Sequence, residues 1–203
     1  VERIKESFGF IASLVSVRLD NGLAIIEFAE ENQRKAEQAL KQISDATAMA
    51  SQGKYQPAIR LYEQALAVLP THTEARLNLA MSQMELGNHG AAKKNLIRVL
   101  QLDPNYVAAY QVLGNLYFKA EKDLGSAERY FASAIDLAPD NPYILNSYGA
   151  LLSTRNQWDA GIAMFERALA AQPDYPNANY GLALALANNG ELDRAIDTLT
   201  NFF

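Results

Sequence analysis

Apolar and small residues recur along this chain with the period of an α-helix, and one pattern returns several times. The stretch GKYQPAIRLYEQALAVLP at residues 53–70 has counterparts in GSAERYFASAIDLAP at 125–139 and NQWDAGIAMFERALAAQP at 156–173. In each, a small residue is followed four positions later by an aromatic residue, then by another small residue and a closing proline. Residues three or four apart share one face of a helix, so each stretch predicts an amphipathic helix. A segment that recurs several times in one chain is typical of a structural repeat rather than of an active site.

The closing prolines set the length of the repeat. They lie 34, 35 and 34 residues apart, at Pro70, Pro104, Pro139 and Pro173. When each proline is numbered as position 32 of its copy, positions 8 and 20 are Ala or Gly in every copy, and position 24 is Tyr, Leu or Phe. Small residues let two antiparallel helices approach closely, and the bulky residue fills the space beside them. The proline ends the second helix, because it pushes the residue before it out of helical geometry.

The period predicts an array of helix pairs over residues 39–203. The copies run at about 39–72, 73–106, 107–141, 142–175 and 176–203, and the last is truncated. One helix pair cannot bury its apolar face alone, so neighbouring pairs are expected to stack. The third copy carries one extra residue, which we place in its turn AEKDLG.

Residues 1–38 allow two interpretations. Stepping the register back by 34 puts Phe8, Ile11 and Phe28 at positions 4, 7 and 24, which predicts a degenerate helical repeat or an N-terminal cap. One long helix from about 23 to 52 is compatible with this interpretation. The alternative is a β-hairpin at 14–28, because the sequence DNG between two apolar runs is a hairpin signal. The repeat register favours the helical interpretation.

Composition narrows the classes of partner. The 203 residues carry 18 Lys and Arg against 23 Asp and Glu, a net charge of −5. This balance gives no electrostatic attraction to nucleic acid, so we expect no nucleic-acid partner. The apolar run at 8–17 is about half of the ~20 residues that a membrane helix needs, so we expect no membrane insertion. The chain contains no cysteine, which excludes disulfides and thiolate chemistry and leaves a cytoplasmic or a periplasmic location open.

The residues that could carry catalysis are sparse. His72 and His89 are the only histidines, and neither has a second ligand at the spacing of a zinc site. No glycine-rich phosphate loop is present, and no histidine is placed to complete a catalytic triad. We therefore predict no catalytic residue, no metal and no cofactor, and a protein that is not an enzyme.

The pattern resembles that of the tetratricopeptide repeat family. That family's 34-residue unit reads W-x2-L-G-x2-Y, then A-x3-F, then P, and the closest copy of its first half is YQVLGNLY at 110–117. No copy has the family's Trp at position 4; the single Trp, Trp158, is at position 17. The resemblance implies an all-α fold, a right-handed α-solenoid of stacked antiparallel helix pairs.

The resemblance also implies a concave groove lined by the first helices, chiefly through positions 2, 5, 9, 12 and 13. The side chains that we expect to bind a partner there are Met81, Met84, Gln111, Asn115, Phe118, Tyr143, Asn146 and Tyr180. Side-chain amides both donate to and accept from a peptide backbone, and Tyr and Met add adaptable apolar contact.

The leading hypothesis is a non-catalytic scaffold that binds a peptide or helical segment of another protein in this groove. The alternative is the recognition or regulatory arm of a larger enzyme, or of a secretion or assembly complex. Self-association through an uncapped C-terminal repeat is a further expectation, because Phe202 and Phe203 have no following helix to cover them. We expect the chain to be a piece of a longer protein, since it begins with Val1 rather than Met.

Overall fold

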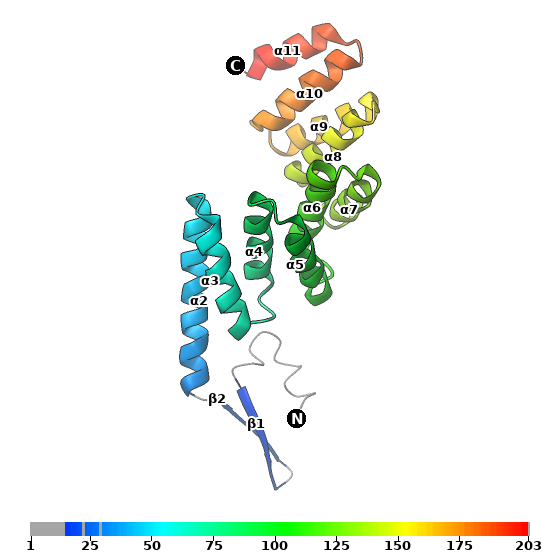
Figure 1. The fold of residues 1–203 in the computed structure, drawn as a ribbon. Coiled ribbons are helices and arrows are strands. Elements are labelled where there is room, and N and C mark those ends of the chain that lie inside the picture. The colour runs from blue at the N-terminus through cyan, green and yellow to red at the C-terminus, as the bar shows by residue number, and fades with distance from the viewer. Residues whose placement is uncertain (1–14, 22, 29, 203) are drawn as a thin grey trace. The chain divides into compact units, whose positions relative to one another are not determined.

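The computed structural model describes residues 15–21, 23–28 and 30–202. It divides into two compact units, Val1–Pro104 and Asn105–Phe203. The sequence predicts a single array from 39 to 203, whereas the division falls between its second and third copies. Each unit is built mainly of paired helices (Figure 1), and each is described below by itself.

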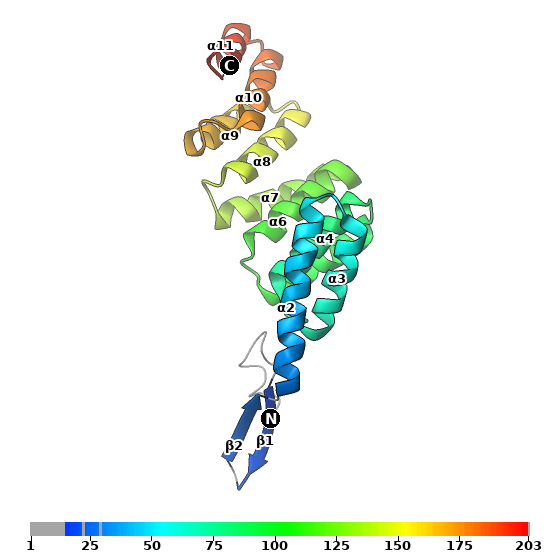
Figure 2. The ribbon, with the colours of Figure 1, turned by 90° about the vertical axis from the view of Figure 1, so that its left-hand side faces the viewer.

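The first described element of the first unit is a β-hairpin. Strands β1 (Val15–Asp20) and β2 (Leu23–Phe28) pair antiparallel, and the two strands lie side by side in both views (Figures 1 and 2). Val17 is opposite Ile26, and Asn21 in the turn takes a left-handed conformation with φ of 48°.

The helical interpretation of this segment is therefore wrong for residues 15–28. Its β-branched residues favour a strand, and Asn tolerates the left-handed turn conformation better than most residues do. These local preferences prevail over a repeat register that lacked a closing proline. Phe8 and Ile11, which that interpretation also used, lie outside the described residues.

Two helix pairs follow in the first unit. The first pair is α2 (Glu30–Ser51) with α3 (Tyr55–Val68), and the second is α4 (Thr73–Glu85) with α5 (His89–Leu102). The helix that the sequence predicts from about residue 23 is α2, which begins only after the hairpin. Position 24 of the first pair is Tyr62, which is fully buried against Ala46 and Ala58 and against Leu79 of α4. The second pair thus covers an apolar face that the first pair leaves open.

The second unit contains three helix pairs. They are α6 (Val107–Asn115), continued by η2 (Leu116–Glu121), with α7 (Leu124–Leu137); α8 (Pro142–Thr154) with α9 (Trp158–Ala171); and α10 (Pro176–Asn188) with α11 (Leu192–Phe202). Helix α10 packs against both α9 and α8. The helices α8 to α11 follow one another as stacked antiparallel pairs (Figure 1).

The small residue at position 8 is needed for this packing. A Cβ atom at Gly114 would lie 2.6 Å from the Cδ1 carbon of Phe131, which is fully buried on the partner helix. In this helix pair, the glycine at position 8 therefore leaves the space that the aromatic ring at position 24 fills.

The extra residue of the third copy has a structural effect that the sequence analysis did not predict. Segment η2 is a π-helix, which holds more residues per turn than an α-helix. It ends at Lys122, which is left-handed with φ of 57°, and Asp123 then caps α7 by accepting a hydrogen bond from the Ser126 backbone N–H at 3.0 Å. The lengthening thus begins inside the first helix instead of being confined to the turn.

Candidate functional site

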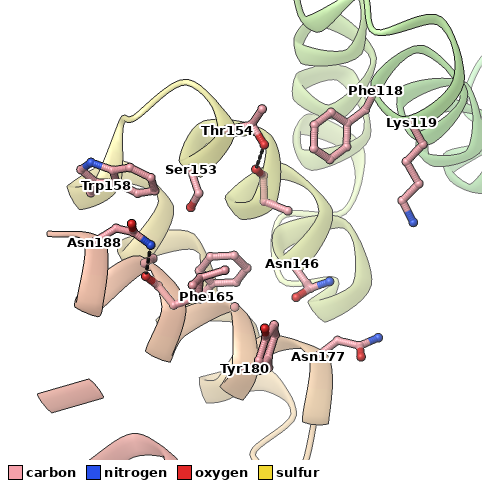
Figure 3. A pocket seen from close by; sticks show the side chains of 14 residues that line it. Phe118, Lys119, Asn146, Ser153, Thr154, Trp158, Phe165, Asn177, Tyr180 and Asn188 are labelled. Carbon is pink, nitrogen blue, oxygen red and sulfur yellow. Dashed lines mark hydrogen bonds between the residues drawn. The ribbon is translucent and has the colours of Figure 1, made fainter. Parts of the chain in front are cut away.

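The second unit holds a hollow of about 500 Å³, which we call the unit-two groove. Its lining comes from η2, α8, α9 and α10, and Figure 3 shows the side chains that surround it. Most of the lining residues lie on the first helices of their pairs, chiefly on α8 and α10.

The floor of the groove depends on two glycines. Phe165 of α9 is only 2% exposed, yet its ring lines the groove. A Cβ atom at Gly149 would lie 3.0 Å from the Phe165 Cε1 carbon, and one at Gly181 would lie 2.5 Å from the same carbon. The ring therefore packs against the bare backbone of α8 on one side and of α10 on the other, and a larger residue at either position would move it.

Apolar side chains form much of the groove wall. Tyr180 and Leu184 on α10 are 66% and 52% exposed, and Phe118 and Trp158 are half-buried. In Figure 3, Phe118 lies on η2, across the groove from Trp158. Exposed aromatic and aliphatic surface in a hollow is what an apolar side chain of a ligand would contact.

The polar groups of the groove are mainly side-chain amides. Asn188 donates its Nδ2 hydrogen to the Leu184 carbonyl at 2.7 Å, which leaves its Oδ1 atom as an acceptor (Figure 3). Asn146 and Asn177 make no side-chain hydrogen bond to any part of the chain that the structure describes. Amides in this state can each donate and accept, as a polypeptide backbone requires of its partner.

One buried hydroxyl and one charge complete the lining. The Ser153 Oγ atom is buried without a hydrogen-bond partner, and a Cβ atom at Gly161 would lie 2.6 Å from it. Lys119, on η2, is the single charged residue among the described residues that line the groove. The groove is thus apolar at its floor, rich in amides, and weakly positive at one end.

Three of the eight predicted groove residues meet here: Phe118, Asn146 and Tyr180. Tyr143 is 50% exposed but is not part of the lining, and its ring instead meets that of Tyr175 edge-on, with centroids 5.2 Å apart. Gln111 and Asn115 are half-buried on α6 and also lie outside the lining, and the Asn115 Oδ1 atom is buried without a partner.

The two methionines belong to the first unit. Met81 is 46% exposed and lines a separate hollow of about 290 Å³, together with Thr47, Tyr62 and Asn78. The Tyr62 hydroxyl lies 2.9 Å from the Thr47 hydroxyl. Burial raises the pKa of the Tyr62 phenol, although its hydrogen bonds to Thr47 and Asn78 act in the opposite direction. Met84 is half-buried on α4 and is not among the residues lining this hollow.

Trp158 and Phe165 are groove residues that the sequence analysis missed. Both lie on a second helix, at positions 17 and 24, whereas the prediction considered first helices alone. The sequence signal that could have indicated Phe165 is the pair of glycines at 149 and 181, because their missing side chains let the ring of a second helix pack between two first helices.

Both histidines lie at the starts of helices. His72 is the N-cap of α4, where its Nδ1 atom accepts a hydrogen bond from the Ala75 backbone N–H at 3.2 Å. His89 is the first residue of α5. Within residues 15–21, 23–28 and 30–202, no three His, Cys, Asp or Glu side chains gather closely enough to hold a metal ion.

A membrane-spanning segment is also not found among the described helices, none of which is both long and apolar enough to cross a bilayer.

Sequence profiles of the tetratricopeptide repeat match residues 49–113, 84–151 and 150–200. The chain belongs to the tetratricopeptide repeat family. The predicted all-α, right-handed α-solenoid is thereby confirmed for the helical repeats of this tetratricopeptide protein, as is the resemblance on which it was based.

The chain is also similar to individual proteins and solved structures. An uncharacterized protein of Haemophilus influenzae is 28% identical over 109 residues, which are 54% of this chain and 60% of that protein. The structure of TTC0263, a tetratricopeptide protein of Thermus thermophilus, superposes with a TM-score of 0.69 at 24% identity, over 81% of this chain and 89% of that one. YrrB, a tetratricopeptide protein with an unusual peptide-binding site, gives a TM-score of 0.61 at 18% identity, over 84% and 88% of the two chains. At these identities the two structures establish the fold alone.

Proposed function

We propose that this tetratricopeptide protein is a non-catalytic scaffold, and that its unit-two groove binds a peptide or helical segment of another protein. The fold is that of a protein-interaction scaffold. The observation that carries the proposal is the pairing of an apolar floor with amides that have no internal partner. Peptide binding by YrrB, which has the same fold, is consistent with it.

A polypeptide segment fits this chemistry better than a small charged ligand does. An apolar side chain of the segment would pack on Tyr180 and Leu184, above the Phe165 ring. The segment's backbone N–H and C=O groups would pair with Asn146 and Asn177, which supply both hydrogen-bond roles. Lys119 favours a segment that is neutral or carries a carboxylate near that end.

The second candidate is that the chain is the recognition or regulatory arm of a larger enzyme or of a secretion or assembly complex. It is favoured by matches to much longer proteins, since the stretch similar to the human protein O-mannosyl-transferase TMTC1 spans only 15% of that protein. Both candidates use the groove in the same way and differ in what is attached to it. In neither do we assign a nucleic-acid partner, because the net charge is −5.

A peptide selected from a random display library on the immobilised chain tests the proposal. We expect hydrogen–deuterium exchange to show that the bound peptide protects backbone amides of α8 and α10 in the second unit. Protection confined to the first unit, or a failure of selection to enrich any peptide, would contradict a binding site in the unit-two groove.

We also propose that the last helix pair takes part in self-association, although the reason differs from the one expected from sequence. Phe203 lies outside the described residues, and Phe202 is half-buried. On α11, the most exposed apolar side chains are instead Leu192 and Ile196, at 61% and 62%.

A further inference from the structure

The separate hollow of about 290 Å³ in the first unit, which Met81 lines, is the repeat counterpart of the unit-two groove. We call it the unit-one hollow, and its lining comes from α2, α3 and α4. Each of its lining residues occupies a repeat position that also lines the unit-two groove. Tyr62 is at position 24, as Phe165 is, and Tyr55 is at position 17, as Trp158 is. The two hollows are therefore the same part of the repeat, built from different side chains.

The side chains at these shared positions give the unit-one hollow a more polar character. Position 24 is Tyr62 in place of Phe165, which adds a hydroxyl group to a buried ring. Position 6 of the following first helix is Asn78 in place of Gly181. Position 13 of that helix is Glu85, which is the single charged residue among the described residues that line the hollow. The unit-one hollow is thus weakly negative, whereas the unit-two groove is weakly positive.

The exposed hydroxyl groups of the unit-one hollow already donate their hydrogens within the chain. Thr47 Oγ1 donates to the Ile43 carbonyl and Ser51 Oγ donates to the Ala48 carbonyl, each at 2.9 Å. Because a hydroxyl has one hydrogen and two lone pairs, a ligand meets both oxygens as acceptors. Glu85 is also exposed, and its carboxylate likewise only accepts. A ligand group that fits these three side chains must therefore be a hydrogen-bond donor.

No internal cation neutralises this carboxylate. In the part of the chain that the structure describes, Glu85 forms no ion pair with a lysine or an arginine. Its charge is thus available to a ligand, and a cationic ligand gains from it both attraction and the correct hydrogen-bond role.

We propose that the unit-one hollow binds an arginine side chain of a polypeptide segment. A guanidinium group carries five N–H donors and no acceptor, and its planar fork matches a carboxylate such as that of Glu85. The face of the group would stack on Tyr55, which is half-buried, while its methylene groups contact Met81, which is 46% exposed. This site goes beyond the proposed function, because it lies in the other unit and does not depend on peptide binding in the unit-two groove.

Selection from a peptide display library with a fixed central arginine and random flanking residues tests the site on the whole chain. We expect the enriched peptides to protect backbone amides of α2 and α4 from hydrogen–deuterium exchange. In the tightest-binding peptide, citrulline in place of arginine keeps the shape of the side chain but removes its charge. This replacement should weaken binding at least about tenfold. Lysine in the same place should also bind more weakly than arginine, since an ammonium group lacks the planar fork.

Glu85→Gln tests the protein side of the same contact, because it keeps the size of the side chain and removes its charge. This variant should bind the arginine peptide about threefold to tenfold more weakly and should bind the citrulline peptide as wild type does. Glu63→Gln is the matched control, because Glu63 is an exposed glutamate of α3 in the same unit and lies outside the lining. It should bind the arginine peptide like wild type.

Several results would overturn the arginine site. They are a selection that enriches no peptide, protection confined to the second unit, and equal affinity of Glu85→Gln and wild type for the arginine peptide. A lysine peptide that binds as tightly as the arginine peptide would overturn the choice of a guanidinium group. These results leave the unit-two groove untouched, since its test uses Asn146 and Asn177 of the other unit.

Discussion

Replacing Gly114 by Ala tests the packing rule that joins positions 8 and 24. The added Cβ would lie 2.6 Å from both the Cδ1 and the Cε1 carbon of Phe131, whereas carbon atoms in van der Waals contact prefer about 3.5–4.0 Å. A displacement of about 1 Å is therefore required. The ring is fully buried in a cluster with Ala127 and Leu151, so it has no free direction in which to move.

The magnitude follows from two opposed effects. Overpacking of this kind costs about 1–3 kcal/mol, and the better helix propensity of Ala returns up to about 1 kcal/mol. We expect Gly114→Ala to lower the free energy of unfolding by about 1–2 kcal/mol, measured by urea denaturation followed by circular dichroism. Gly114→Leu should cost more, because it adds three further carbon atoms at the same place.

Gly90→Ala is the matched control. Gly90 lies in the first turn of α5, and nothing lies within 4 Å of a Cβ atom placed there. This variant should be as stable as wild type or slightly more so. If Gly114→Ala were as stable as Gly90→Ala, the reasoning that this glycine is required by the Phe131 ring would be refuted.

Two further predictions concern helix caps in the second unit. Asn141 Oδ1 accepts hydrogen bonds from the backbone N–H groups of Tyr143 and Ile144 at the start of α8, at 3.0 and 3.3 Å. Asn141→Ala removes this cap and should lower the free energy of unfolding by about 1 kcal/mol in the same urea assay. Hydrogen bonds from the Ser126 hydroxyl and backbone N–H lower the pKa of Asp123 in the folded protein. The contribution of the Asp123 carboxylate to stability should therefore be present above its ordinary pKa of about 3.9, and it should be lost as the pH falls through the lower pKa of the folded state. Asp123→Asn should remove that part of the pH dependence, and an unchanged pH profile would contradict the cap.

The helical repeats were predictable because they obey a local rule. Small residues at positions 8 and 20, a bulky residue at 24 and a closing proline recur at fixed spacing, and each has a packing reason. The hairpin at 15–28 was considered only as the alternative, because extending the repeat register gave more weight to apolar spacing than to the turn chemistry at Asp20 and Asn21. The π-helix η2 was missed, since an inserted residue can be accommodated in a turn or within a helix, and the sequence does not distinguish the two.

The groove was predictable only in part. Of the residues expected from positions on first helices, Phe118, Asn146 and Tyr180 line one hollow. The same positions included Tyr143, whose ring instead packs on Tyr175, a contact that depends on how two pairs stack. Phe165 could not be inferred from its own position, because its access to the groove depends on the missing side chains of Gly149 and Gly181.

The central claim is that amides of the unit-two groove bind a peptide backbone. Isothermal titration of a library-selected peptide into wild type and into Asn146→Ala with Asn177→Ala tests it most directly. Each lost hydrogen bond should cost on the order of 1 kcal/mol, so the double variant should bind about tenfold to a hundredfold more weakly, with an unchanged thermal melt. Gln101→Ala, which removes an exposed amide on α5 in the first unit, should bind like wild type. Equal affinity of wild type and the double asparagine variant would contradict the account.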